Sequence, residues 1–550
     1  MSEGRRGWIR VAAELALVVA LAVGPLLPFL DKAFHIDDYS YLRAARQILS
    51  DPLRPYDFQI NWRGTSEPAW QMMNKPPLVP YVLALGIRLF GEQERPLHAL
   101  FLVFPVVSGL SLYAIARRCT RWPLWPTLAF LACPAALVGS TNLMLDNPSL
   151  ALYLAAIAAF LSAEERRSAG RFWIAGVLIG VATWSNYVCL SLLPLLALYL
   201  IVKERRVTLR LAYLLIPAAF FGLWCLQGWW ANGTPDILVA AGHHADEGEM
   251  PYFYPALIAL LTFTGGCIAP LLVLSPFITR GWLQLAVALG AAIAGAAVLG
   301  FAGRHLTPAG LPIPLLGIGL GAVFAFAGVS IFYLAGRYLR EEFSAERLLL
   351  VAWIGGIAAF LLFFNWTVAA RFLLFLAPPA LIIGFHALEE RMARPGWRVA
   401  IAAVAVAGSL ALSLGLARAD TRWANEQRRR ALEIRAALPG PVGRSYFLCH
   451  WGLQYYFERA GLKPFDLEKP EVELGACLVV ASVSSGHPIP PGLVPYVTLY
   501  RHLTYQPGLS LQLQSPRCGA GFYTHKHGPL PFTVSAAVQE EYAIYRVSGR

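Results

Sequence analysis

The sequence predicts an all-α protein that crosses a membrane many times and carries a small extracytoplasmic α/β domain at its C-terminal end. Composition is the first observation: the 550 residues are 57% hydrophobic and 14% charged, whereas soluble domains carry about 25% charged residues. The second is that apolar residues gather in windows of roughly 20, the length that a helix needs to cross a bilayer. The third is that these windows stop after residue 417, where strand-like segments begin.

The apolar windows predict about thirteen spans within a membrane domain that covers 1–417. We expect the first to be a retained helix and not a cleaved signal peptide, because it is long, lacks a clear small-residue cleavage site and is followed by further apolar windows. The expected spans are 11–30, 97–116, 123–140, 148–163, 172–186, 188–202, 211–230, 254–278, 282–302, 312–336, 348–366, 372–389 and 399–417.

The basic residues predict the orientation of these spans. The net charge is +12, but Lys and Arg stand in short clusters between apolar windows and do not alternate with aromatic residues, which argues against nucleic-acid binding. With a cytoplasmic N-terminus, every cluster falls on the cytoplasmic side, and the short outer loops contain only Arg304 and Arg371. This asymmetry is typical of a multi-pass protein of the plasma (inner) membrane.

Two regions of the sequence do not belong to the series of predicted membrane spans. Residues 31–96 form a long outer loop whose apolar run "PPLVPYVLALGIRLF" is too short to span comfortably and predicts a juxtamembrane helix. Residues 418–550 contain the strand-like pieces "ACLVVASV" and "YVTLYRHLTY", which predict the outer α/β domain. The eight cysteines contain no CxxC metal pattern. A disulfide among those of the polar tail would leave one of them over: Cys449, Cys477 and Cys518.

A pair of acids follows the first span. In "HIDDYSYLRAARQIL", at 35–49, Asp37 and Asp38 precede apolar residues at helical spacing, which predicts an amphipathic helix on the membrane surface. One Asp is a good N-cap, because its carboxylate accepts a backbone N–H. Two adjacent acids repel each other and must be solvated or paired, so capping and chemistry both stay open.

An acidic pair after the first membrane helix, followed by an amphipathic helix, resembles the GT-C glycosyltransferases. The closer resemblance is to the family-39-like and aminoarabinose-transferase-like branch, which includes protein O-mannosyltransferases. It covers most of 1–390 and implies a GT-C fold. Further similar elements occur in order along the chain: "NKPPLVPY" at 74–81, "LMLDNPSLALYLAA" at 143–156, "ARFLLFLAPPA" at 370–380 and "CHWGLQYYFE" at 449–458.

The resemblance implies an integral membrane glycosyltransferase. Such an enzyme moves a sugar, with inversion, from a polyprenyl-phosphate-linked donor to a hydroxyl of a lipid, glycan or protein acceptor on the extracytoplasmic face. It implies Asp37 as general base, Asp38 as helper or metal-contacting acid and Asp146 as a third acid of the same cavity. It implies Lys75 and Arg371 at the donor phosphate, which Arg grips bidentately and Lys meets as a point charge.

Some residues depart from the family's pattern. The pair is Asp-Asp where Asp-Glu is usual, and Asn74 replaces the Glu that helps to hold a metal in aminoarabinose transferases. "ATWSNYV", at 182–188, stands where many members have a lysine, so no phosphate role is assigned there.

Each site residue also has a structural interpretation. Lys75 could extend to the interface, Asp146 could cap the next helix, and Arg371 could be a charge that flanks a helix end. In "AGHHADEGEMPYFY", at 241–254, the side chains of His243, His244 and Glu247 could hold a divalent metal, contact substrate or stay solvated.

A secondary transporter or lipid flippase is the alternative function, and a non-catalytic scaffold is a weaker one. A transporter would show an inverted repeat and ionisable groups near the midplane of the membrane. No such repeat is visible, and the notable charges stand at the outer rim. A transferase predicts instead that Asp37, Lys75, Asp146 and Arg371 meet at one outward-facing cavity.

Overall fold

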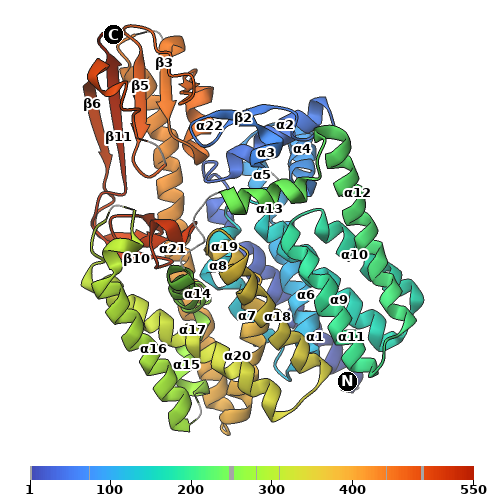
Figure 1. The fold of residues 1–550 in the computed structure, drawn as a ribbon. Coiled ribbons are helices and arrows are strands. Elements are labelled where there is room, and N and C mark those ends of the chain that lie inside the picture. The colour runs from blue at the N-terminus through green and yellow to red at the C-terminus, as the bar shows by residue number, and fades with distance from the viewer. Residues whose placement is uncertain are drawn as a thin grey trace.

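The computed structural model describes residues 3–73, 75–246, 253–279, 281–308, 310–440, 442–484 and 488–549. A helical body carries a smaller domain rich in strands at one end, and the long helix α21 (Pro395–Ala437) runs from one into the other (Figure 1). The chain begins at the opposite end of the body.

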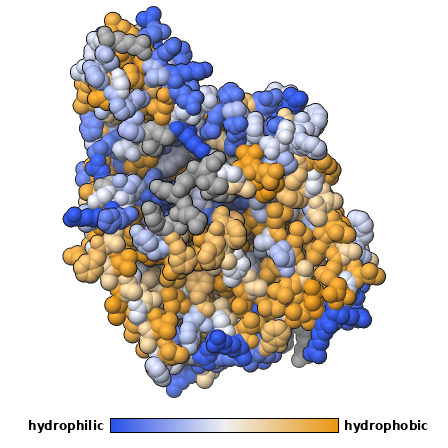
Figure 2. Space-filling view, viewed as in Figure 1, coloured by the Kyte–Doolittle hydropathy of each residue, from blue (hydrophilic) through white to orange (hydrophobic). Residues whose placement is uncertain are grey.

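The body is a bundle of apolar helices. Nine helical segments of the described residues are long and apolar enough to cross a membrane, or ten if a bent pair counts as one span. Apolar side chains cover the flank of this bundle, while hydrophilic residues gather at its lower end and over the strand-rich domain (Figure 2). The helices of the nine segments are α1 (Glu3–Val23), α5 (Glu94–Phe101), α6 (Val103–Cys119), α9 (Asp146–Arg166), α11 (Leu192–Glu204), α12 (Leu215–Asn232), α16 (Gly281–Phe301), α17 (Leu315–Glu341), α18 (Ala345–Phe363) and α21.

The prediction of a polytopic helical body is therefore confirmed, but the count of thirteen spans is not. Four expected spans are shorter or broken, at α7 (Leu124–Leu131) with α8 (Pro134–Gly139), α10 (Ala169–Thr183), α14 (Phe253–Cys267) with α15 (Pro270–Ile278), and α19 (Ala370–Leu373) with α20 (Ala377–Arg391). The chain bends by 98° between α14 and α15. Proline explains three breaks, because α8, α15 and α20 begin with Pro in their first two positions, where its missing N–H is tolerated.

The long outer loop folds over the end of the bundle that faces the strand-rich domain (Figure 1). Its helix α2 (Asp38–Ser50) buries Leu42, Ala45 and Ile48 and packs against α4 (Leu78–Phe90). Between them lie β1 (Gln59–Asn61), β2 (Ser66–Pro68) and α3 (Ala69–Met72), and α13 (Asp236–Asp246) crosses nearby. Helix α2, α3 and the turn between β1 and β2 contribute residues to the cavity described below.

The C-terminal region has a five-stranded mixed sheet in the order β4-β3-β5-β11-β6, which confirms the small α/β region. Strand β3 pairs in parallel with β4 and β5, and β11 pairs antiparallel with β5 and β6. Cys449, Cys477 and Cys518 are buried and free. The elements are β3 (Ser445–Leu448), α22 (Trp451–Arg459), β4 (Lys463–Pro464), β5 (Cys477–Ala481), β6 (Val497–Tyr505), β7 (Ser510–Gln512), β8 (Gln514–Ser515), β9 (Ala520–Gly521), β10 (Thr533–Ser535) and β11 (Glu540–Val547).

Helix α21 crosses the expected domain boundary at 417–418 without a break. The division of the chain into 1–417 and 418–550 stays a proposal, with α21 common to both parts.

Candidate functional site

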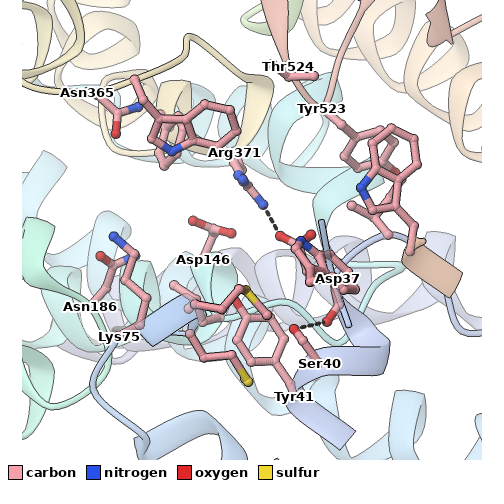
Figure 3. A pocket seen from close by; sticks show the side chains of 18 of the residues that line it. Asp37, Ser40, Tyr41, Lys75, Asp146, Asn186, Asn365, Arg371, Tyr523 and Thr524 are labelled. Atoms are coloured by element: carbon pink, nitrogen blue, oxygen red, sulfur yellow. Dashed lines mark hydrogen bonds and ion pairs between the residues drawn. The ribbon is translucent and has the colours of Figure 1, made fainter. Parts of the chain in front are cut away.

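A cavity of about 220 Å³ lies where the outer loop, the helical body and the C-terminal region meet. Asp37, Lys75, Asp146 and Arg371 all line it, although they come from four separate segments of the chain. In the close view, Asp146 lies between Lys75 on one side and the Asp37–Arg371 pair on the other (Figure 3). The convergence expected from the sequence is therefore present in the structure.

Asp37 faces this cavity and does not cap a helix through its side chain. It occupies the N-cap position of α2, but its carboxylate makes no capping hydrogen bond. The carboxylate instead accepts a hydrogen bond from Nη1 of Arg371, and only about a fifth of either side chain is exposed (20% for Asp37, 18% for Arg371). Burial disfavours the charge on Arg371, but the carboxylates of Asp37 and Asp146 outweigh burial and raise its pKa above the ordinary value.

Lys75, Asp146 and Arg63 complete the charged lining. Lys75 follows α3, and its Nζ lies 5.5 Å from the ring centroid of Tyr187. Burial, reinforced by the charge of Arg371 and opposed by Asp146, lowers the pKa of Lys75 to about 8. Asp146 is buried in the first turn of α9, where the N-terminal end of a helix favours a carboxylate.

Asp38 lies behind the cavity wall and is fully buried. Its two carboxylate oxygens accept hydrogen bonds from the backbone N–H of His35 and of Leu143, each at 2.8 Å. Burial raises its pKa to about 7. Asp38 thus ties the segment that carries Asp37 to the segment that leads into Asp146.

A second charged cluster, buried behind the cavity, was missed by the sequence analysis. Nζ of Lys32 lies 2.5 Å from Oδ2 of Asp420 and also donates to Thr141 and Asn142, at 3.0 and 2.6 Å. The hydroxyl of Tyr523 donates to the same Asp420 oxygen at 2.7 Å. This cluster joins the first outer loop, the body and α21. The one signal in the sequence was Lys32 itself, a lone cation directly after the first span.

Polar and aromatic residues that the sequence did not single out also line the cavity. Asn186 lies in the segment 182–188, to which the sequence assigned no phosphate role, and Asn365 lies six residues before Arg371. The C-terminal region contributes Trp451, Tyr523 and Thr524. No local pattern marks these residues, because their position depends on the packing of distant segments.

The candidate metal loop is only partly described. His243 and His244 lie in α13, but their side chains are outside the described part of the chain, as are Glu247 and Asn74. Among the residues that the structure describes, no group of three or more His, Cys, Asp and Glu side chains is arranged to hold a metal ion.

The fold and the cavity define a class: a multi-pass membrane protein with a polar, charged pocket at one end of its helical bundle. Comparison with known proteins indicates a more specific class. Residues 74–230 match the family described as dolichyl-phosphate-mannose-protein mannosyltransferase. This match confirms, for that segment, the predicted resemblance to membrane glycosyltransferases of the GT-C type. The segment includes Lys75 and Asp146.

Two curated relatives match stretches of similar length. The chain is 24% identical over 163 residues to an uncharacterized protein of Aquifex aeolicus, across 29% of this chain and 32% of that protein. It is 28% identical over 137 residues to dolichyl-phosphooligosaccharide-protein glycotransferase 1 of Archaeoglobus fulgidus, across 24% of this chain and 22% of that protein. The matches therefore span at most about a third of these relatives.

Solved structures show weaker similarity. ArnT from Cupriavidus metallidurans bound to undecaprenyl phosphate is 17% identical, with a TM-score of 0.44 over 90% of this chain and 96% of that one. The apo state of the same protein gives 15% identity and a TM-score of 0.40 over all of both chains.

Proposed function

We propose that this protein is a membrane glycosyltransferase that moves a sugar from a polyprenyl-phosphate-linked donor to an acceptor hydroxyl. The observation that carries the proposal is the meeting of two acids and two cations at one cavity: Asp37, Asp146, Lys75 and Arg371. The match of residues 74–230 to a family of lipid-phosphate-dependent mannosyltransferases supports it independently.

The cations suit the phosphate of the donor. When the bond from the anomeric carbon to the phosphate oxygen breaks, the oxygen leaves with the electron pair, and nearby cations stabilise the growing negative charge. Arg371 has capacity for this, because its Nε is buried and has no hydrogen-bond partner among the described residues. A phosphate oxygen would supply that acceptor, and Lys75 would meet the same group from the other side of Asp146.

Asp37 suits the role of general base. It would take the proton of the acceptor hydroxyl while the acceptor oxygen forms a bond to the anomeric carbon, and a single displacement of this kind inverts the configuration there. Asp146 balances the two cations, and Asp38 positions the backbone around Asp37 through its hydrogen bonds to His35 and Leu143.

We assign the cavity to the extracytoplasmic face of the plasma (inner) membrane. The asymmetry of Lys and Arg supports this orientation, and the cavity lies at the end of the body that carries the C-terminal region, which contributes Trp451 and Tyr523. The lipid chain of the donor would then lie in the outer leaflet. The acceptor hydroxyl could belong to a lipid, a glycan or a protein.

The test uses the full chain in liposomes, offered a panel of polyprenyl-phosphate sugars and acceptors, with release of polyprenyl phosphate as the readout. We expect turnover by the wild type and a fall of roughly 10²–10⁴-fold in Asp37→Asn, because a positioned base contributes about that factor. Asp31→Asn is the matched control, since Asp31 lies in the same loop but is exposed and pairs with Arg95.

Equal turnover by wild type and Asp37→Asn, with both folded, would remove Asp37 from the chemistry. Proton-coupled uptake of a solute by the same liposomes, without any sugar transfer, would favour the transporter alternative.

A further inference from the structure

Three tryptophans line the cavity, and each is partly exposed there. Trp62 comes from the outer loop, Trp366 from the segment between α18 and α19, and Trp451 from the first position of α22. Interfacial tryptophans usually face the bilayer headgroups. These three line a pocket that also contains two acids and three cations, so a membrane-anchoring role does not explain them.

Trp451 is held in an unusual backbone conformation. Only four non-glycine residues of the described chain have a positive φ, and two of them, Ile36 at 47° and Trp451 at 62°, line this one cavity. Such conformations are costly for bulky and β-branched residues, and they persist where the surrounding structure imposes them, often at binding sites. Ile36 directly precedes Asp37, the proposed base. One of the two strained residues therefore adjoins the base in the chain, and the other lines the same cavity.

The neighbouring packing shows what imposes this conformation. A Cβ atom at Gly452 would lie 2.2 Å from the backbone oxygen of Phe34, so α22 starts in direct contact with the segment before Asp37. The ring of Trp451 also lies edge-to-face with Trp423, at 6.4 Å between centroids, and 5.7 Å from His527. The position of the indole at the cavity is therefore fixed from three directions.

Hydrogen-bonding groups line the same cavity as the tryptophans. Asn186 and Asn365 line the same cavity from the body, and Thr524 lines it from the C-terminal region (Figure 3). Nζ of Lys526 lies 4.9 Å from the ring centroid of Trp366, which fixes that indole as well. The face of an aromatic ring is negative, so it attracts the slightly positive C–H groups of a sugar ring. The amide and hydroxyl groups can bind the hydroxyls at the edge of the sugar.

We infer that Trp451 provides an aromatic face against which a sugar ring packs in this cavity, which Trp366 also lines, so that the C-terminal region is part of the substrate site. This inference rests on the proposed function and extends it to a residue and a region for which no role has been given. The sugar ring belongs either to the donor or to a carbohydrate acceptor. The kinetic measurements described next distinguish these two sources.

The first arm measures kinetics of Trp451→Leu and Trp451→Phe. Leucine keeps bulk without an aromatic face, whereas phenylalanine keeps a face. We expect KM to rise about five- to tenfold in the leucine variant, as the loss of one aromatic contact predicts, with kcat changed much less and the phenylalanine variant close to wild type. A rise in the KM of the donor assigns the ring to the donor sugar, and a rise in the KM of the acceptor assigns it to a carbohydrate acceptor.

The second arm measures binding without catalysis. Methyl pyranosides of several hexoses are added to the protein in nanodiscs, free of glycoside detergents whose headgroups would compete, and saturation transfer from protein to the sugar C–H protons is recorded by NMR. We expect transfer in the wild type, in Trp451→Phe and in Trp282→Leu, and its loss in Trp451→Leu. Trp282 is the matched control because it is 80% exposed on α16, away from the cavity.

The outcomes separate this inference from the proposed function. Sugar binding that depends on Trp451, without turnover on any donor, would support the sugar face while the transferase proposal fails. Turnover that depends on Asp37, with equal KM and equal saturation transfer in wild type and Trp451→Leu, would overturn the sugar face alone. Equal losses in the leucine and phenylalanine variants, with equally lowered melting temperatures, would reduce Trp451 to a packing residue and overturn it as well.

Discussion

Two carboxylate–cation pairs, one at the cavity and one behind it, differ in what surrounds them. Asp37 and Arg371 are each about a fifth exposed, and Nε of Arg371 has no partner among the described residues. Lys32 and Asp420 are completely buried, and the ammonium group of Lys32 has three oxygen partners. The first pair is partly exposed at a cavity and can contact a ligand, whereas the second pair has no exposed surface and can only hold the fold together. The two pairs thus separate the binding role from the structural one.

Breaking the buried pair is expected to have the largest effect. Lys32→Met leaves the buried Asp420 without its cation, with only His35 and the Tyr523 hydroxyl beside it, and removing one partner of a buried pair costs about 3–5 kcal/mol of unfolding free energy. Thermal or denaturant unfolding in detergent measures the loss. Adding Asp420→Asn removes the orphan charge and should restore part of the stability. A stability of Lys32→Met equal to wild type would show that the pair does not hold the domains together.

Breaking the cavity pair should affect turnover more than stability. Under the proposed function, Arg371→Gln removes a donor to the leaving phosphate, and we expect kcat to fall about 10²–10³-fold, as for the loss of one such donor. Its melting temperature should fall less than that of Lys32→Met, because Asp37 stays partly solvated. Arg95→Gln, in an exposed pair with Asp31, is the control. If Arg371→Gln lowered the melting temperature as much as Lys32→Met and left kcat unchanged, the two pairs would not differ in role.

The smallest effect is a pH dependence at Lys75. Its pKa is lowered to about 8, so the ammonium is charged below pH 8 and neutral above it. The donor phosphate stays anionic throughout, so kcat/KM should fall as pH rises through 8, by up to about tenfold per unit. Lys75→Arg keeps its charge and should extend the plateau to higher pH. Identical profiles for wild type and Lys75→Arg would show that Lys75 does not meet the phosphate.

Hydropathy predicted the membrane body and its α/β appendage because burial in lipid leaves a long, simple pattern in a sequence. The count of thirteen spans is not confirmed where proline starts a new helix inside an apolar window, as at Pro134 and Pro270. Asp37, Lys75, Asp146 and Arg371 were selected through the resemblance to the GT-C glycosyltransferases, Arg371 also because basic residues are rare in the short outer loops. The structure brings the four residues together at one cavity.

The remaining site residues could not be read from local patterns. Lys32 and Asp420 are 388 positions apart and meet only through the tertiary fold. Asp38 and Asp37 are identical neighbours in the sequence, yet their side chains point to different surroundings because successive residues of a helix turn by about 100°. Trp451 borders the cavity because Gly452 packs against Phe34, and no periodicity records that contact.

Helix α21 has a mechanical consequence. Its 43 residues run without interruption, which corresponds to a rod of about 65 Å, and Asp420 fastens the middle of that rod to the first outer loop. Helices adjust their tilt to the thickness of the bilayer. Because the rod is continuous, a change of tilt would be transmitted to the strand-rich region at its far end, whose residues line part of the cavity. Bilayer thickness is thereby expected to affect the width of the cavity.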